Sequence, residues 1–146
     1  ILYSRVETHG EILYNSINSS DSRKVFFIHG GVDVENRELC RSITEKENNA
    51  IIVASYGTFS TGINIKRLHN IIFASPSKSR IRNLQSIGRV LRKGENKSVA
   101  VLYDIADDTT KDGRSPNYTL RHLFERVKIY NQESFDYELI KVKLKQ

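Results

Sequence analysis

Apolar and polar positions along the chain predict strands and helices that follow one another in turn. Three short runs are almost continuously apolar, and each is followed by glycine, proline or polar residues: Lys24–His29, Ala50–Ser55 and Asn70–Ser75. Such runs are typical of strands that are buried on both faces of a sheet. Two further strands are predicted at Ile1–Val6 and Ser98–Ile105.

Between the predicted strands, apolar residues recur at the spacing of one helical face. This pattern predicts helices over His9–Ile17, Val34–Lys46, about 79–92 and Tyr118–Tyr130, with Asp33 as the N-cap of the second. The expected apolar faces are Ile12, Leu13 and Ile17 in the first helix, Leu39, Cys40 and Ile43 in the second, and Leu120, Leu123, Phe124 and Val127 in the last.

Strands that alternate with helices favour a parallel sheet that is covered by helices on both faces. The expected fold class is therefore α/β, a three-layer sandwich with a mostly parallel central sheet. At 146 residues the chain is long enough for one domain with a core of its own. Residues 118–146 are expected to complete that domain with a terminal helix and an edge strand at Tyr137–Leu144, where apolar and polar residues alternate.

Composition narrows the classes of protein that fit. The 23 lysines and arginines exceed the 17 aspartates and glutamates, and the net charge of +6 favours an anionic partner such as nucleic acid. The single cysteine, Cys40, excludes an internal disulfide and favours a reducing compartment. No run reaches the roughly 18 apolar residues of a membrane span, and no signal peptide is recognisable. The absence of an initiating methionine indicates a fragment of a longer protein.

The most informative side chains lie in the predicted helix over about 79–92. Gln85, Arg89 and Arg92 fall on one side of this helix, because they are spaced by four and three residues. Planar, always-charged guanidinium groups suit a phosphoryl group whose charge shifts during transfer. For the two arginines alone, a solvated basic face on an amphipathic helix is the commoner explanation.

Polar and glycine-rich segments follow the predicted strands. Because ligands in such sheets bind at the carboxyl ends of the strands, Gly30–Gly31, Ser55–Gly62 and Ser75–Lys78 are expected to share one edge. The stretch 55–62 offers main-chain N–H groups and hydroxyls to phosphate oxygens, although an ordinary polar turn has the same composition. Gly30–Gly31 also fits a tight turn, and Lys78 fits either a phosphate contact or a solvated surface lysine.

The sequence contains neither a phosphate-binding loop nor an arrangement typical of a metal site. The pattern G-x-x-x-x-G-K-[ST] is absent, and the four histidines are scattered. Asp107 and Asp108 follow a predicted strand in a polar loop, where a surface role is favoured over magnesium binding. The chain therefore has arginines that suit a nucleotide but nothing that holds a nucleotide by itself.

Two segments, Val53–Asn64 and Gln85–Arg92, lie in the order and at the distance of two motifs in the second RecA-like domain of superfamily 2 helicases and translocases. The sequence resembles bacteriophage recombination helicases most of all. Val53–Asn64 is similar to motif V, and Gln85–Arg92 is similar to motif VI in the form Q-x-x-G-R-x-x-R. Phe27–Gly31, with Arg37 beyond it, resembles motif IVa, whereas Ile1–Arg5 is a poor match to motif IV. The resemblance covers most of the chain and is weakest near the C-terminal end.

The resemblance implies roles for these residues in nucleotide hydrolysis. Arg92 would be the arginine finger that reaches the γ-phosphate of ATP, with Arg89 at the same phosphate or at the switch residues of the motor. Gln85 would order that surface, and Gly62 and Asn64 would lie near the nucleotide. ATP with Mg²⁺ would be bound mainly by an N-terminal RecA-like domain that this chain lacks. Asn64 departs from the family pattern, because other members carry an aspartate there.

The resemblance also implies contacts with nucleic acid at the strand ends. Ser55, Tyr56 and Gly57 would face the nucleic-acid backbone. Gly30 and Gly31 would offer main-chain N–H groups to another phosphate.

The implied function is the C-terminal half of an ATP-dependent DNA helicase or translocase. Such a protein would remodel branched DNA in recombination, repair or replication, in the bacterial or phage-infected host cytoplasm. Its expected partners are single-stranded or branched DNA and the N-terminal RecA-like domain of the same protein, with no membrane. The isolated chain is expected to be inactive. The alternatives are a non-catalytic nucleic-acid-binding module and a motor that moves along RNA.

Overall fold

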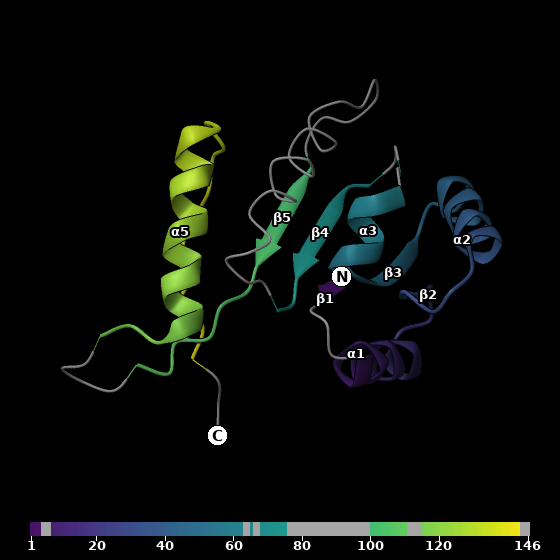
Figure 1. The fold of residues 1–146 in the computed structure, drawn as a ribbon, viewed down its shortest axis with the longest axis horizontal. Coiled ribbons are helices and arrows are strands. Elements are labelled where there is room, and N and C mark those ends of the chain that lie inside the picture. Colours follow the sequence, from purple (N-terminus) through teal and green to yellow (C-terminus); the bar gives the residue numbers. More distant parts are fainter. Residues whose placement is uncertain (4–6, 63–64, 66–67, 76–99, 111–114, 144–146) are drawn as a thin grey trace.

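The computed structural model describes residues 1–3, 7–62, 65, 68–75, 100–110 and 115–143 (Figure 1). Within these ranges the strands are β1 (Leu2–Tyr3), β2 (Lys24–Ile28), β3 (Ala50–Ser55), β4 (Asn70–Phe73) and β5 (Val101–Asp104). The helices are α1 (Glu7–Ser20), α2 (Val34–Lys46), α3 (Tyr56–Gly62) and α5 (Tyr118–Gln132). Figure 1 shows α5 beside β5, and α1 and α2 at the opposite end of the sheet.

The strands form a sheet in the order β2-β3-β1-β4-β5, and each pair of neighbours runs parallel. β2 and β3 pair along the whole of β2, from Lys24 beside Ala50 to Ile28 beside Ala54. The predicted α/β fold with a parallel central sheet is therefore confirmed. Because the strands point the same way, their carboxyl ends lie at one edge of the sheet.

Helices cover the sheet from both sides. The chain crosses the sheet in one direction from β1 to β2 and in the other direction from β2 through β3 to β4. Right-handed crossovers therefore place α1 on one face and α2 and α3 on the opposite face. α1 packs on β2 and β3, whereas α3 packs on β3 and β1. Figure 1 shows α1 and α2 on different sides of β2.

The core lies where the central strands meet these helices. β3 contributes Ile52, Val53 and Ala54, each with at most 9% of its surface exposed. This burial matches the continuous apolar run that predicted β3. The other apolar residues that are buried in the core are Ile28, Tyr56, Ile65, Ile71, Phe73, Ile129 and Tyr130.

α2 begins and ends where its sequence pattern predicts. The main-chain N–H of Asn36 donates a hydrogen bond of 2.8 Å to Asp33 Oδ1, which satisfies one of the free donors in the first turn. The predicted apolar face is partly wrong, because Leu39 is 56% exposed, whereas Cys40 packs against the core. No residue of α2 is buried, so the helix reaches the core only with a narrow stripe that includes Cys40.

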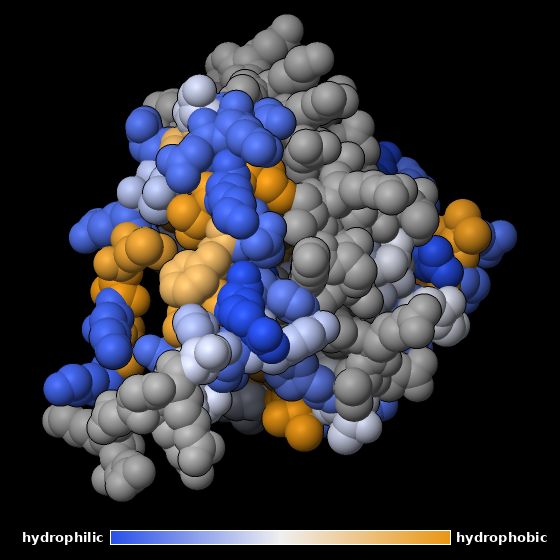
Figure 2. All heavy atoms as spheres, turned by 60° about the vertical axis from the view of Figure 1, so that its left-hand side comes forward, coloured by the Kyte–Doolittle hydropathy of each residue, from blue (hydrophilic) through white to orange (hydrophobic). Residues whose placement is uncertain are grey.

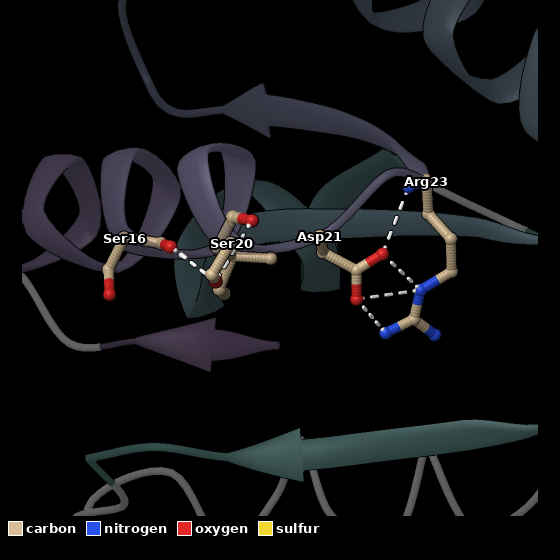
Figure 3. Close-up of polar contacts among 5 residues, drawn as sticks. Ser16, Ser20, Asp21 and Arg23 are labelled. Carbon is tan, nitrogen blue, oxygen red and sulfur yellow. Dashed lines mark hydrogen bonds and ion pairs between the residues drawn. The ribbon is translucent and has the colours of Figure 1, made fainter.

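α1 is longer than the apolar spacing predicts, because it continues past Ile17 to Ser20. In its last turn the hydroxyl of Ser20 donates to the carbonyl oxygen of Ser16 at 2.7 Å (Figure 3). Such side-chain bonds are not visible in a pattern of apolar positions. Ile12, which was expected on the apolar face, is 61% exposed, whereas Leu13 and Ile17 are partly buried.

The stretch after β3 is helical, although the sequence predicted a loop there. Tyr56 is 2% exposed, and its ring lies 5.3 Å from the ring of Phe73. Phe59 also packs against the core. These contacts explain why a segment rich in serine, threonine and glycine forms α3, because tertiary packing outweighs low helix propensity.

The face that α5 buries matches the predicted one only in part, since Val127 packs against the core as expected. The buried residues are His122, Arg126, Ile129 and Tyr130, which are spaced as i, i+4, i+7 and i+8. The predicted member Phe124 is 45% exposed. Hydrophobicity alone assigns histidine and arginine to the solvent side, whereas here the carboxylate of Asp104 inside the fold accepts hydrogen bonds from Nε and Nη2 of the arginine.

No strand forms in the described part of the predicted edge strand at Tyr137–Leu144. Ser134, with a positive φ of 54°, reverses the chain after α5, and the Phe135 N–H donates to the Tyr130 carbonyl oxygen at 2.9 Å. The ring of Tyr137 then lies 6.0 Å from the ring of Tyr130. This turn therefore places the start of the segment against α5 instead of in a ladder with a strand.

Apolar side chains are exposed on the side of the molecule that β5, α5 and the C-terminal segment form. Figure 2 brings this side forward and shows apolar groups between hydrophilic ones. The exposed residues are Val101 and Tyr103 on β5, Ile105 directly after it, Tyr118 and Phe124 on α5, and Tyr137, Leu139, Ile140 and Val142 beyond α5. In the described ranges, none of the helices combines the length and apolar character that a membrane crossing requires.

Candidate functional site

The carboxyl edge of the sheet brings together the strand ends that the sequence singled out. His29–Gly31 follow β2, Ser55–Gly57 include the end of β3, and Ser75 lies just beyond β4. These strands belong to one parallel sheet, so the predicted common edge is confirmed. Asp107 and Asp108 follow β5 at the same edge.

Arg37 holds the loop between β2 and α2. Its Nε donates to the carbonyl oxygen of Val32 at 2.7 Å, and its Nη2 donates to the carbonyl oxygen of Gly30 at 3.3 Å. The Val32 N–H donates to the carbonyl oxygen of His29 at 3.1 Å, which closes a turn over the two glycines. Arg37, the residue noted beyond the motif IVa resemblance, therefore fixes the shape of this loop.

The two glycines of the loop have different surroundings. The Gly31 N–H donates to Nδ1 of His29 at 3.2 Å. A Cβ atom at Gly31 would lie 3.0 Å from Cε1 and 3.2 Å from Nδ1 of the same ring, whereas nothing lies within 4 Å of such an atom at Gly30. Gly31 thus permits a close approach of the histidine ring. Its N–H, which the resemblance assigns to a phosphate, is bonded to His29 in this structure.

At the end of β3 the side chains point inward. Ser55 Oγ and Thr58 Oγ1 are 2.8 Å apart, and the Thr58 N–H donates to Ser55 Oγ at 3.4 Å, so Ser55 caps the first turn of α3. Tyr56 is 2% exposed as a whole residue, so it offers no surface for the predicted contact with nucleic acid. Gly57 is exposed, and nothing lies within 4 Å of a Cβ position there.

The carboxylates near this edge accept hydrogen bonds from neighbouring residues. Both side-chain oxygens of Asp33 accept from Asn36, and these bonds lower the pKa of Asp33. Asp108 accepts from the main-chain N–H of Thr110 at 3.1 Å, and its hydrogen bonds with Thr110 lower its pKa. Both groups are therefore anionic at neutral pH. Among the described residues, no three His, Cys, Asp or Glu side chains are placed to hold a metal ion.

Five of the predicted site residues lie outside the described part of the chain. They are Asn64, Lys78, Gln85, Arg89 and Arg92. Gly62 lies at the end of α3. The roles of these residues in binding a nucleotide or nucleic acid stay predictions.

A buried polar cluster between β5 and α5 was missed by the sequence analysis. Arg126 Nε and Nη2 donate to the two carboxylate oxygens of Asp104 at 2.7 and 2.8 Å, and the Tyr130 hydroxyl donates to the same carboxylate at 2.5 Å. Burial and the neighbouring Asp104 raise the pKa of Tyr130, so this hydroxyl stays protonated. The available signal was an arginine four residues before a tyrosine in a helix, together with an aspartate that ends an apolar strand.

A cavity of about 430 Å³ lies at the opposite edge of the sheet. Its lining includes Ile17 near the end of α1, Ala50 at the start of β3 and Asn70 at the start of β4. Because the strands are parallel, this cavity is separated from the carboxyl-edge loops by the length of the sheet.

Comparisons with known sequences assign the chain to a family. Residues 1–94 match the helicase conserved C-terminal domain. The chain is 38% identical to the ATP-dependent DNA helicase uvsW of Enterobacteria phage T4, in a match that covers 94% of this chain and 29% of the relative. It is 28% identical to a putative ATP-dependent RNA helicase of Acanthamoeba polyphaga mimivirus, with 91% and 24% covered.

Solved structures agree with this assignment. The crystal structure of T4 UvsW matches with a TM-score of 0.71 and 37% identity, over 94% of this chain and 29% of that chain. The C-terminal part of the Fun30 ATPase domain matches with a TM-score of 0.60 over 90% of this chain and 47% of that chain. At 18% identity, this second likeness shows the fold alone.

The chain spans less than a third of the length of the two curated relatives that it matches. The family match nevertheless covers well over half of the chain, and the fold is the RecA-like α/β fold of its structural relatives. The chain therefore belongs to the helicase conserved C-terminal domain family.

Proposed function

We propose that this chain is the C-terminal RecA-like domain of an ATP-dependent superfamily 2 DNA helicase. The whole helicase remodels branched DNA in recombination, repair or replication. The observation that carries this proposal is the 38% identity, over 94% of the chain, to a phage protein named as an ATP-dependent DNA helicase. The parallel sheet supports it, because the loops after β2, β3 and β4 share one edge that a ligand can span.

In this proposal, ATP lies between this domain and an N-terminal RecA-like domain of the same protein. The present sequence has no phosphate-binding loop, so the N-terminal domain holds ATP with its Mg²⁺, which neutralises charge on the transferring phosphoryl group. Arg92 is the arginine finger at the γ-phosphate, Arg89 contacts the same phosphate, and Gln85 orders that surface. Gly62 and Asn64 lie beside the nucleotide.

The proposed nucleic-acid track runs along the carboxyl edge of the sheet. The exposed glycines of the β2–α2 loop and Gly57 in the first turn of α3 suit contacts with phosphate oxygens, which need donors rather than a particular side chain. Repeated closure of the two RecA-like domains on ATP then moves this edge relative to its counterpart. The proposed contacts are Gly30, Gly31, Ser55, Gly57 and Lys78, whereas the buried Tyr56 supports the turn from below. The protein works in the cytoplasm of a bacterium or a phage-infected host, without a membrane partner.

Replacing Arg92 tests the motor directly in the protein that contains both RecA-like domains. In the Arg92→Ala variant we expect DNA-stimulated ATP hydrolysis to fall by about 10³- to 10⁵-fold, which is the usual effect of losing an arginine finger. DNA affinity should change little, because Arg92 lies at the nucleotide. Arg23→Ala is a control, because it removes the same charge from an exposed position just before β2, at the opposite edge of the sheet.

A binding module without catalysis makes the opposite prediction. If Arg92 contacts DNA phosphates, the Arg92→Ala variant should bind DNA more weakly, with a salt dependence of log K that is smaller by about 0.7–0.9. Weaker binding of this kind, together with no ATP hydrolysis by the wild-type protein, would overturn the motor proposal.

RNA is a second possible track, because the mimivirus relative is named as a putative RNA helicase. The test compares the stimulation of ATP hydrolysis by DNA and RNA strands of the same sequence and length. We expect DNA to stimulate more strongly. Stronger stimulation by RNA would show that the motor is correct but that its track is RNA.

A further inference from the structure

The hydrogen bond from Gly31 to His29 determines which nitrogen of the histidine ring carries a proton. The Gly31 N–H donates to Nδ1 at 3.2 Å, so Nδ1 must present a lone pair. A neutral imidazole then carries its proton on Nε2. Within the described part of the chain, Nε2 has no hydrogen-bond partner. His29 therefore presents one N–H donor that the loop itself does not use.

Packing holds this ring in place. The centroid of the His29 ring lies 5.0 Å from that of Phe27, and the Phe27 ring in turn stacks on Tyr14 of α1 at 5.5 Å. On its other side the ring is so close to Gly31 that a Cβ there would lie only 3.0 Å from Cε1. The ring is thus held between Phe27 of β2 and the glycine turn, which reduces the entropy that it loses when a ligand binds.

The surroundings of His29 suit an anion. Arg37 of α2 draws the carbonyl oxygens of Gly30 and Val32 toward its own guanidinium group and brings a positive charge to the loop. The nearby carboxylate, Asp33, is engaged by both the main-chain and side-chain nitrogens of Asn36. Gly30 and Gly31 are exposed, and His29 is only partly buried, so a nucleic-acid strand can approach the turn.

We propose that Nε2–H of His29 donates a hydrogen bond to a phosphate oxygen of the nucleic-acid backbone at the carboxyl edge. The inference rests on the proposed function and refines it, because it assigns a side-chain donor to a loop that the resemblance credits with main-chain donors alone. Gly31 then acts mainly by holding the ring in the donating tautomer. His29 is a phosphate-contacting residue, and its contact is neutral.

Two substitutions separate the two nitrogens of the ring. In His29→Asn the side-chain oxygen can take the place of Nδ1 and keep the bond from Gly31, but no outward donor remains. In His29→Gln the amide nitrogen can reach the position of Nε2, so the outward donor is kept. Both variants are neutral, so they change no charge at the loop.

The experiment measures the affinity of the full-length protein for a single-stranded DNA 20-mer by fluorescence anisotropy over a range of salt concentrations. We expect His29→Asn to weaken binding by about 3- to 10-fold, which is the usual effect of one hydrogen bond. His29→Gln should stay within about twofold of the wild type, and the salt slope should be unchanged in both, because a neutral donor releases no counterion.

Each outcome of this experiment decides a specific point. Binding by His29→Asn that equals that of the wild type would overturn the His29 contact and leave the helicase proposal intact. An effect that depends on the base sequence of the 20-mer would also overturn it, because phosphates are the same in every sequence. A wild-type protein that binds neither DNA nor RNA would overturn the proposed function and the His29 contact together.

Discussion

Two bidentate arginine–carboxylate pairs at opposite edges of the sheet show how much the surroundings decide what a contact does. Arg126 and Asp104, at the carboxyl end of β5, have side chains that are 2% and 9% exposed. Arg23 and Asp21, just before β2, have side chains that are 42% and 26% exposed (Figure 3). In both pairs the guanidinium group binds both carboxylate oxygens. The buried pair has lost its water, whereas the exposed pair can exchange its partner for water.

The two pairs consequently have different structural roles. Arg126 and Asp104, with Tyr130 as a third partner, fix the position of α5 against β5, because any other arrangement would leave a charge buried without a partner. Asp21 and Arg23 shape a local turn, in which the Arg23 N–H also donates to Asp21 Oδ1 at 2.9 Å. The same chemistry therefore holds a helix on the sheet in one place and closes a turn in the other.

Replacing Arg126 should have the largest effect on stability. We expect Arg126→Met to lower the free energy of unfolding by about 3–5 kcal/mol, because the carboxylate of Asp104 remains buried without its counter-charge. Urea unfolding measures this loss. The control Arg121→Met changes an exposed arginine of the same helix and should be nearly neutral.

A second substitution separates the charge from the packing. The double variant Asp104→Leu with Arg126→Met removes both charges and should recover most of the lost stability. If the double variant were as unstable as the single one, the loss would arise from packing around Arg126 and not from the unpaired carboxylate.

The buried strands were the most predictable part of this fold. β3 is apolar along its length and buried on both faces, so its bounds follow directly from the sequence. The bounds of α2 were equally predictable, because Asp33 marks its first turn and the polar pair Asn48 and Asn49 lies just beyond its last turn. The common edge of the strand ends also follows from the sequence, since alternating strands and helices imply a parallel sheet.

The features that could not be predicted depend on partners distant in the sequence. α3 forms because Tyr56 packs against Phe73, and Arg126 of α5 points inward because it donates hydrogen bonds to Asp104. The contact between His29 and Gly31 depends on a ring orientation that no periodicity encodes. For the candidate site, the sequence therefore predicts which loops converge but not which donors remain available in them.

Replacing Asp33 should have an effect on stability between those of the buried and the exposed pair. Asp33 is exposed, but it accepts from a main-chain N–H that has no other partner in the helix. We expect Asp33→Ala to lower Tm by a few degrees, since a free N–H of the first turn of α2 loses its acceptor. Asp33→Asn keeps an acceptor oxygen and should retain most of the stability. Equal losses in both variants would show that the charge of Asp33, and not the cap, stabilises α2. Differential scanning calorimetry measures each Tm.

Replacing Asp21 should have the smallest effect and completes the comparison. Asp21→Asn keeps an oxygen for the Arg23 N–H but removes the charge, so we expect Tm at pH 7 to fall by about 2 °C or less. The hydrogen bonds with Arg23 lower the pKa of Asp21 from its usual 3.8 to about 2.

The pH dependence and the salt dependence of this small difference identify its cause. A pKa that is lower in the folded state means that the pair stabilises the fold above about pH 4 and loses this contribution as the pH falls toward 2. The Tm difference between wild type and Asp21→Asn should therefore shrink over that range, and also at 1 M salt, because the pair is exposed. The loss caused by Arg126→Met should persist in high salt, since buried charges are poorly screened. A difference at Asp21 that survives 1 M salt would show that the turn geometry, and not the ion pair, is what Asp21 contributes.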